Sequence, residues 1–398
     1  MRPLAVAAAL LLYGLLSAPA PPAPGMVEAV VGGLLLVAAG WHRPLAVACG
    51  AALLRPRPAL WEAAGVLAFA ALLWPPLLRG LAQGWDLRQV ARDVVPLLFL
   101  FLPVVLVPLL RPAGAAAVRW LAGGLAAAGV LFTVRWWDEM GWGFGAVGTR
   151  AMPEGAHYVL NAPSVLFAAI LLPAVATGWL VRGGMLRRLA APVLLAGGAL
   201  CLAALAGAVH RMALGLAAVA LWGVMLWWGR RAPWTVGGLL AVAAGLAWGL
   251  DGPVFGAIDQ VVEKSRSAGL NARGAEAVAV LERVADDPVA LLVGEGWGAL
   301  LANPAVGGWR VAYTHTLVSY TLFKAGLLGL LGLLAWLIGL VPAARRLLRT
   351  DPILAAAILP PLAVSLGLHT SFKYLDCGLL VTLMILSSSK DDPSGHLE

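Results

Sequence analysis

The chain has 398 residues, of which 61% are hydrophobic and only 12% are charged, with a formal net charge of +8. A soluble domain carries about 25% charged residues, so this composition excludes an ordinary soluble protein and indicates a membrane protein. Most of the positive charge is arginine that falls between apolar runs, which argues against nucleic-acid binding. The three cysteines lack the spacing of a zinc site or a disulfide framework.

Apolar stretches recur along the whole chain at lengths near the roughly 17–25 residues that a helix needs to cross a bilayer. The twelve expected spans lie at 3–20, 26–40, 60–79, 93–110, 113–134, 158–180, 189–208, 212–229, 233–250, 313–341, 352–368 and 374–388. The stretch 44–54 is short for a crossing, and we expect it to lie in the interface or to extend the second span. The first stretch also has features of a secretory signal, but the prolines after it and the next apolar run favour an uncleaved span.

Arginine clusters in short loops set the expected orientation, because positive residues mark the cytoplasmic side of a membrane. In the twelve-span scheme one side receives the clusters at 43–57, 111, 182–188, 230–231 and 345–349. Both termini are then cytoplasmic. In a bacterium the membrane would be the inner membrane and the opposite side would be the periplasm.

The longest polar segment, 251–312, falls on the outer side and divides the chain. We expect transmembrane helices 1–9 over 1–250, a periplasmic helical loop over 251–312, and helices 10–12 with a short cytoplasmic tail over 313–398. Apolar periodicity within the loop predicts two amphipathic helices, at 254–268 and 274–285.

The pattern Gly294-Glu295-Gly296-Trp297-Gly298 lies further along this loop. It lacks the strand and helix context of a nucleotide site, so it predicts a tight turn that allows close backbone approach.

Three titratable or cationic positions meet the expected outer boundary: Arg211, which His210 precedes, Arg273, which opens the second loop helix, and His315, which opens the tenth span. Each has a structural alternative. Arg211 would snorkel from a span end, Arg273 would be a solvated face residue, and His315 would be a polar cap. His210, Arg310 and Tyr313 are possible supporting residues.

Two acidic pairs, Asp138-Glu139 and Asp286-Asp287, have the chemistry to bind a divalent cation. Such pairs are more often solvated or cap helices, so we expect neither a metal nor another cofactor.

The segment RSAGLNARGAEAVAVLERVADDPVALLVGEGWG, followed by YTHTLVSYTLFKAGLLGLLGLL, resembles the signature region of the O-antigen ligase and O-antigen polymerase family. The matching elements, in order, are Arg273, Pro288, Gly294, Gly296, His315, Gly326 and Gly329, with Arg211 upstream. The chain departs from the pattern in three places. His210 stands where serine is usual, Thr316 where asparagine is common, and Lys324 in place of a frequent acidic residue.

The resemblance implies an all-α, polytopic, GT-C-like fold with about twelve transmembrane helices. It also implies an inverting, metal-independent glycosyltransferase that moves a glycan from an undecaprenyl-diphosphate carrier to an acceptor hydroxyl. Arg211 and Arg273 would bind the diphosphate, because arginine holds phosphate bidentately and stays charged. His315 would accept the proton of the acceptor hydroxyl.

Several functions stay open at this point. Within the family we prefer ligation to lipid A-core over polymerisation of O-antigen or exopolysaccharide repeat units, because the chain is compact with one long outer loop. A lipid-linked glycan transporter or flippase would use the same basic residues as a path for lipid phosphate. A noncatalytic membrane scaffold is the third class. Membrane lipids are expected partners in all three cases, and nucleic acid in none.

Overall fold

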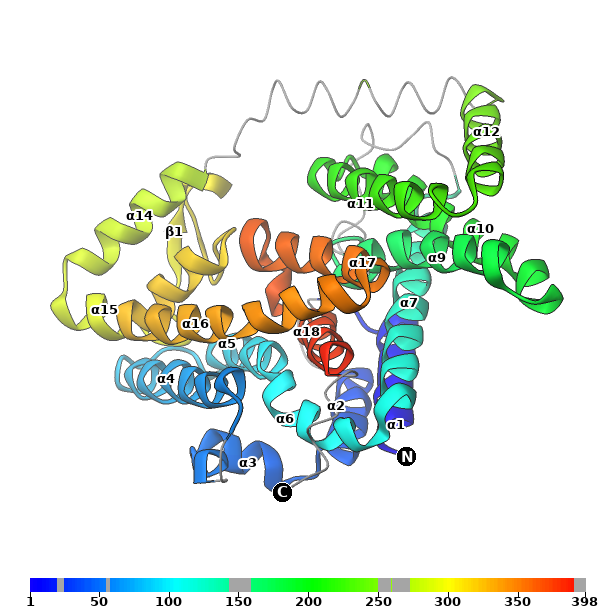
Figure 1. Ribbon diagram of the computed structural model, residues 1–398. Helices are drawn as coiled ribbons and strands as arrows, with labels where there is room; N and C mark the ends of the chain where they lie inside the picture. The colour runs from blue at the N-terminus through cyan, green and yellow to red at the C-terminus, as the bar shows by residue number, and fades with distance from the viewer. Residues whose placement is uncertain (20–24, 55–57, 143–158, 250–258, 260–272, 390–398) are drawn as a thin grey trace.

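The computed structural model describes residues 1–19, 25–54, 58–142, 159–249, 259 and 273–389 (Figure 1). The first half of this part contains α1 (Arg2–Leu16), α2 (Met26–Ala39), α3 (His42–Ala48), α4 (Leu60–Ala82), α5 (Leu87–Leu100), α6 (Leu102–Leu110), α7 (Gly114–Glu139) and α9 (Pro163–Arg182). The second half contains α10 (Met185–Gly207), α11 (Arg211–Gly229), α12 (Pro233–Gly249), α14 (Arg273–Ala285), α15 (Pro288–Val293), α16 (Leu317–Thr350), α17 (Pro352–Ala363) and α18 (Leu375–Ser388). The expected all-α class is confirmed, since the described residues form only one small sheet, the hairpin of β1 (Leu301–Asn303) and β2 (Trp309–Val311).

Each of the twelve expected spans contains a helix, but they differ in length. Within the described residues, six helical stretches are long and apolar enough to cross a membrane, and a seventh is obtained if α2 and α3 form one bent span. The remaining apolar helices, α1, α12, α17 and α18, are shorter. The chain is therefore a membrane protein with several apolar helices, and the count of twelve crossings stays a prediction.

Two apolar runs that we expected to be continuous are divided by breaks in the backbone. The expected span 93–110 is divided at Phe101 into α5 and α6, with Pro103 at the start of α6 where its missing N–H costs nothing. The stretch 44–54 forms α3 and a short 3-10 helix, and α2 and α3 meet at an angle of 87°. This stretch is therefore a bend that follows the second span.

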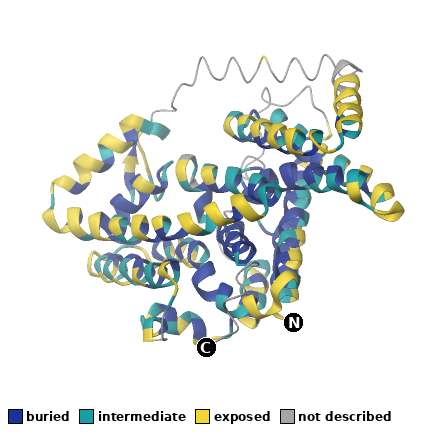
Figure 2. Ribbon diagram, viewed as in Figure 1, coloured by how far each residue is buried: buried dark blue, intermediate teal, exposed yellow. Residues whose placement is uncertain are grey.

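α18 lies at the centre of the helical bundle, and all of its side chains are buried (Figures 1 and 2). It packs against α5, α6, α7, α16 and α17. The loop that leads into α18 carries His369, and the packing of α18 holds this loop against the bundle.

The segment that we name the outer segment, after its expected side of the membrane, consists of α14, α15 and the hairpin, and it packs on the first half of α16 (Figure 1). The expected helix at 274–285 is confirmed as α14, whereas the expected helix at 254–268 lies outside the described residues. We expected a helical loop, but the described part of it also contains the hairpin of β1 and β2. Asn303 ends β1 and caps the next turn, and Gly307 and Gly308 adopt positive φ, so the chain reverses into β2.

The expected glycine turn at 294–298 is confirmed. Gly294, Gly296 and Gly298 all have positive φ. The amides of Glu295 and Gly296 donate to the carbonyls of Phe323 and Lys324 in α16, at 2.8 and 3.1 Å. Those carbonyls are free because α16 is broken at Gly326, whose φ is 62°.

A buried ionic cluster connects the same turn to α5 and α16. Asp93 accepts hydrogen bonds from the Gly298 amide (2.8 Å), the Tyr320 hydroxyl (2.8 Å) and the Lys324 ammonium (2.5 Å). Lys324 also donates to the carbonyl of Ala299 at 2.6 Å. The two charges are thus paired, and their remaining bonds hold the outer segment in place.

Candidate functional site

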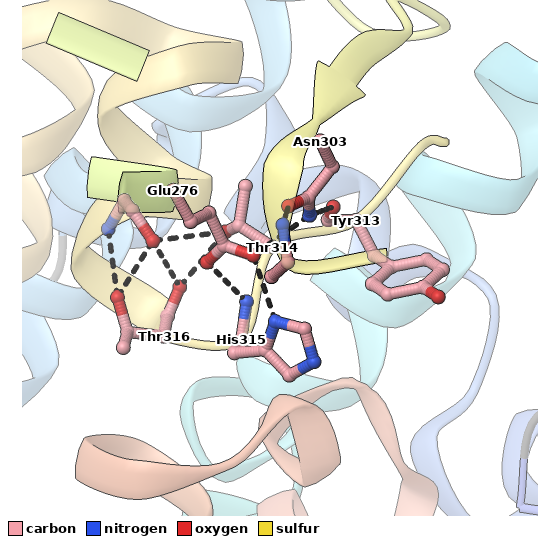
Figure 3. Close-up of polar contacts among 8 residues, drawn as sticks. Glu276, Asn303, Tyr313, Thr314, His315 and Thr316 are labelled. Atoms are coloured by element: carbon pink, nitrogen blue, oxygen red, sulfur yellow. Dashed lines mark hydrogen bonds and ion pairs between the residues drawn. The ribbon is translucent and has the colours of Figure 1, made fainter. Parts of the chain in front are cut away.

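His315 is held by a buried carboxylate from the outer segment. Glu276, on α14, is 1% exposed, and its Oε2 lies 2.7 Å from Nδ1 of His315. Its Oε1 accepts the backbone amide of His315 at 2.7 Å, and Asn303 donates to Oε2 at 2.7 Å. These contacts fix the ring in one orientation, with the other ring nitrogen facing away from the carboxylate (Figure 3).

The local sequence explains why His315 is presented in this way. Thr316 caps α16 by accepting the amide of Ser319, so His315 lies just before the helix, not inside it. Its own amide is then available to Glu276. The alternative was a polar cap that donates to a carbonyl, whereas Nδ1 of His315 contacts the Glu276 carboxylate and Thr316 caps the helix.

The protonation state of the pair follows from its surroundings. Burial alone would raise the pKa of Glu276, but hydrogen bonds from the His315 ring, the His315 amide and Asn303 hold the pKa below its usual range. Glu276 is therefore ionised at neutral pH and only accepts hydrogen bonds. Nδ1 of His315 must then carry the proton, which leaves the lone pair of Nε2 available in the neutral ring. The His315 side chain is 26% exposed.

Arg211 and Arg273 line one cavity of about 250 Å³, which we name the arginine cavity. His210 and His369 also line it, and no carboxylate does so among the described lining residues. The four side chains come from the start of α11, the start of α14 and the loop after α17. The expected proximity of the two arginines is thus present in the structure.

Helix geometry adds to the positive potential of this cavity. Arg211 is the first residue of α11, and the cavity is lined by Arg211, Met212 and Ala213. Amides in the first turn of a helix lack intrahelical partners and attract anions. The arginine cavity therefore combines two guanidinium groups with a helix N-terminus, an arrangement suited to a phosphate-bearing ligand.

His369 links the arginine cavity to His315. Burial, and then the charges of Arg273 and His315, lower the pKa of His369 to about 4. Among the described residues, Nδ1 of His369 and Nε of Arg273 are buried without a hydrogen-bond partner. Arg273 also lies three residues before Glu276, about one helical turn away. The cavity and the Glu276–His315 pair therefore belong to one site.

The three possible supporting residues lie in different places. His210 lines the arginine cavity, and Tyr313 packs edge-on against His315 with ring centroids 6.0 Å apart. Arg310 is exposed on β2 and lines a different cavity of about 420 Å³. We name this second space the carboxylate cavity, because Glu282, Asp286 and Glu295 line it.

The acidic pairs were considered as ligands for a divalent cation, and the described contacts of Asp286 and Asp287 are of another kind. Asp287 caps α15 and pairs with Arg79 at 2.6 Å, as the structural alternative expected. Its partner Asp286 lines the carboxylate cavity. No group of three His, Cys, Asp or Glu side chains with the geometry of a metal site occurs within the described part of the chain.

Sequence reasoning missed Glu276, Asn303 and His369. Glu276 had one visible signal, since it follows Arg273 at helical spacing on a helix that was expected to lie at the membrane mouth. Nothing in the sequence indicated that it would pair with a residue 39 positions away.

No protein-family model matches the chain, and no curated protein or solved structure gives a significant match. The resemblance to O-antigen ligases and polymerases therefore stays a prediction that rests on the motifs.

Proposed function

We propose that this protein transfers a glycan from an undecaprenyl-diphosphate carrier to an acceptor hydroxyl. The observation that carries the proposal is the arginine cavity, which is lined by Arg211, Arg273 and His369, with the charges of both Arg273 and His315 acting on His369. In this assignment the protein lies in the bacterial inner membrane, the site faces the periplasm and both termini are cytoplasmic.

The diphosphate of the donor occupies the arginine cavity, and its polyprenyl tail stays in the lipid. Arg211 and Arg273 bind the phosphate oxygens, and the amides of Met212 and Ala213 in the first turn of α11 add hydrogen-bond donors. The Arg211 amide itself already donates to the carbonyl of Val209 at 3.0 Å. These groups offset the charge that grows on the departing diphosphate, which is electrostatic stabilisation of the transition state. A neutral His369 beside them contributes a hydrogen-bonding nitrogen and no competing charge, because its pKa is lowered to about 4.

His315 activates the acceptor. The acceptor hydroxyl gives its proton to Nε2 of His315 while its oxygen forms a bond to the anomeric carbon of the glycan. The bond from that carbon to the diphosphate oxygen breaks, and the electron pair leaves with undecaprenyl diphosphate. Glu276 stabilises the resulting imidazolium, which later loses its proton to water. Attack opposite to the leaving group inverts the anomeric configuration.

The preferred acceptor is lipid A-core, and a growing O-antigen or exopolysaccharide chain is the alternative within the same chemistry. The test is a transfer assay with purified full-length protein, a labelled undecaprenyl-diphosphate glycan, and each acceptor offered separately. Labelled lipid A-core supports ligation, labelled products of stepwise length support polymerisation, and the absence of any covalent product contradicts both.

A lipid-linked glycan transporter is the candidate of another class. The buried Asp93–Lys324 pair favours it, because ionisable residues within membrane helices often mark transport paths. However, both members of this pair are also bonded to the backbone of the 298–299 turn, which fits a fixed structural role. Movement of the labelled donor across sealed vesicles without product formation would favour the transporter.

A further inference from the structure

The carboxylate cavity lies on the opposite stretch of α14 from the arginine cavity. It has a volume of about 420 Å³ and is lined by residues of α14 and the hairpin and by Trp85 and Phe323. The glycan transfer described above assigns no role to it. Its position and its lining chemistry both differ from those of the arginine cavity.

α14 contributes residues to both cavities, and between these residues it carries Glu276, which holds the base His315. Arg273 lies in the arginine cavity, Glu276 holds His315, and Ala279 and Arg283 line the carboxylate cavity. Arg273 and Arg283 are ten positions apart, which corresponds to about 15 Å along the helix axis. The arginine cavity, the carboxylate that holds the histidine base and the carboxylate cavity therefore follow one another along α14.

The charges of the two cavities are opposite in character. Among the residues that the structure describes, two arginines, two histidines and no carboxylate line the arginine cavity, whereas three carboxylates and two arginines line the carboxylate cavity. Arg283 is already paired with Glu295, at 3.1 Å from Nε to Oε1. Glu282 and Asp286 thus leave an excess of negative charge over Arg310, which disfavours a phosphate and favours hydroxyl or amino groups.

The aromatic side chains complete a surface that suits a saccharide. The indole N–H of Trp85 donates to the carbonyl of Glu295 at 3.0 Å, which holds the ring at the rim of the cavity. Phe323 also lines the cavity, although it is only 2% exposed. A sugar ring combines apolar C–H faces with hydroxyl donors, and a pocket of aromatic surface with a few placed polar groups matches both.

We propose that the carboxylate cavity binds the sugar residues of the acceptor, with Glu282 and Asp286 accepting hydrogen bonds from hydroxyl or amino groups. This inference rests on the proposed function, in which the acceptor hydroxyl reaches Nε2 of His315. The acceptor then reaches the base from a cavity that begins at Ala279, about one turn of α14 beyond Glu276, while the diphosphate of the donor remains in the arginine cavity.

Two kinds of variant test the cavity. The double variant Glu282→Gln, Asp286→Asn removes the charges with little change of shape, and Ala279→Phe fills the space without changing charge. Asp138→Asn is the matched control, because Asp138 is an exposed carboxylate at the end of α7 and does not line the cavity.

The first measurement is saturation-transfer NMR on purified full-length protein with dephosphorylated core oligosaccharide, released from lipid A, as the soluble probe. We expect binding to the wild type and to Asp138→Asn, and binding at least about tenfold weaker in both cavity variants. The double variant loses hydrogen bonds to charged groups, each worth about a factor of ten or more, and Ala279→Phe occupies the space of the ligand. Equal binding in the wild type and both cavity variants overturns the inference, as does absence of binding to the wild type.

The second measurement is transfer kinetics. We expect the KM for the acceptor to rise about tenfold in the cavity variants while the KM for the lipid-linked donor stays within about twofold. A rise confined to the donor KM would overturn the inference and assign the cavity to the donor glycan. If the wild type forms no product, the proposed transfer fails, and the NMR measurement still decides whether the cavity binds saccharide.

Discussion

The carboxylate of Glu276 bonds both the ring nitrogen Nδ1 and the backbone amide of His315, each at 2.7 Å, although the two residues are 39 positions apart in the chain. This double contact fixes both where the imidazole stands and which nitrogen carries its proton. It also connects the base to α14, the helix that begins at Arg273 in the arginine cavity. Glu276 is thus a positioning residue for the proposed reaction.

The first prediction concerns Glu276→Gln. An amide of the same shape keeps part of the hydrogen bonding but cannot stabilise an imidazolium. We expect kcat to fall about ten- to a hundredfold, as for other residues that orient a functional histidine. The KM for the donor should not change. Steady-state kinetics from pH 5.5 to 8.5 should also show an altered pH profile, which a merely structural change would not produce.

The second prediction concerns the arginines of the arginine cavity. Arg211→Ala and Arg273→Ala should each weaken binding of undecaprenyl diphosphate, because a phosphate oxygen loses a bidentate partner. Arg→Lys at either position should restore only part of the affinity, since lysine keeps the charge but not the planar fork. The measurement is direct binding of the glycan-free lipid diphosphate to protein in nanodiscs.

Arg349→Ala serves as the control for these variants, because Arg349 is an exposed arginine in the last turn of α16 and lies outside the cavity. Equal loss of binding in Arg349→Ala would mean that net charge, and not the cavity, attracts the ligand. Wild-type affinity in both arginine-cavity variants would reject the assignment of the diphosphate.

The helices of this protein could largely be predicted from the apolar runs, because each run of suitable length forms a helix in the membrane environment that the composition indicates. Their ends were less predictable. The break at Gly326 depends on a backbone crossing with Gly294, where a Cβ on Gly326 would lie 2.5 Å from the Gly294 amide nitrogen. A sequence pattern does not reveal such a crossing.

The candidate site was predictable only in its parts. Arg211, Arg273 and His315 were found because they are polar residues at the boundaries of apolar runs. Glu276 and His369 were missed, since their roles come from contacts between segments far apart in the chain. Arg310 was grouped with the site because it lies near His315 in sequence, but the hairpin directs it into the carboxylate cavity.

The third prediction follows from the lowered pKa of His369. The histidine in the unfolded chain titrates near 6.5, whereas in the folded protein its pKa is about 4 because of burial and the nearby positive charges. Between these values the unfolded chain binds a proton that the folded chain does not, so stability falls as the pH is lowered from about 6.5 to 4. His369→Gln should reduce this loss, measured as the difference in unfolding temperature between pH 7 and pH 5.

Glu276 acts in a separate pH range, which distinguishes the two groups. Its folded pKa is below the usual 4.5, so its contribution to stability is present above that pH and is lost as the pH falls further. The change in stability between pH 7 and pH 5 therefore does not report the titration of Glu276 itself. If His369→Gln gave the wild-type change over this range, the assignment to His369 would be wrong.

The fourth prediction concerns the buried pair that holds the 298–299 turn. Asp93→Asn or Lys324→Met alone leaves one buried charge without its partner, and we expect each to destabilise the fold by about 3–5 kcal/mol. The double variant removes both charges and should recover most of that loss. Reversible unfolding in mixed micelles measures the three differences, and strictly additive losses in the double variant would contradict the pairing.

The most direct test of the central claim is the rate of covalent glycan transfer by His315→Ala, measured beside its binding of undecaprenyl diphosphate. We predict a fall in kcat of about 10²- to 10⁴-fold, because the acceptor hydroxyl loses its proton acceptor. Diphosphate binding should remain close to that of the wild type, since Arg211 and Arg273 are intact. Transfer at the wild-type rate would show that His315 is not the base, and absence of transfer by the wild type itself would contradict the proposed reaction.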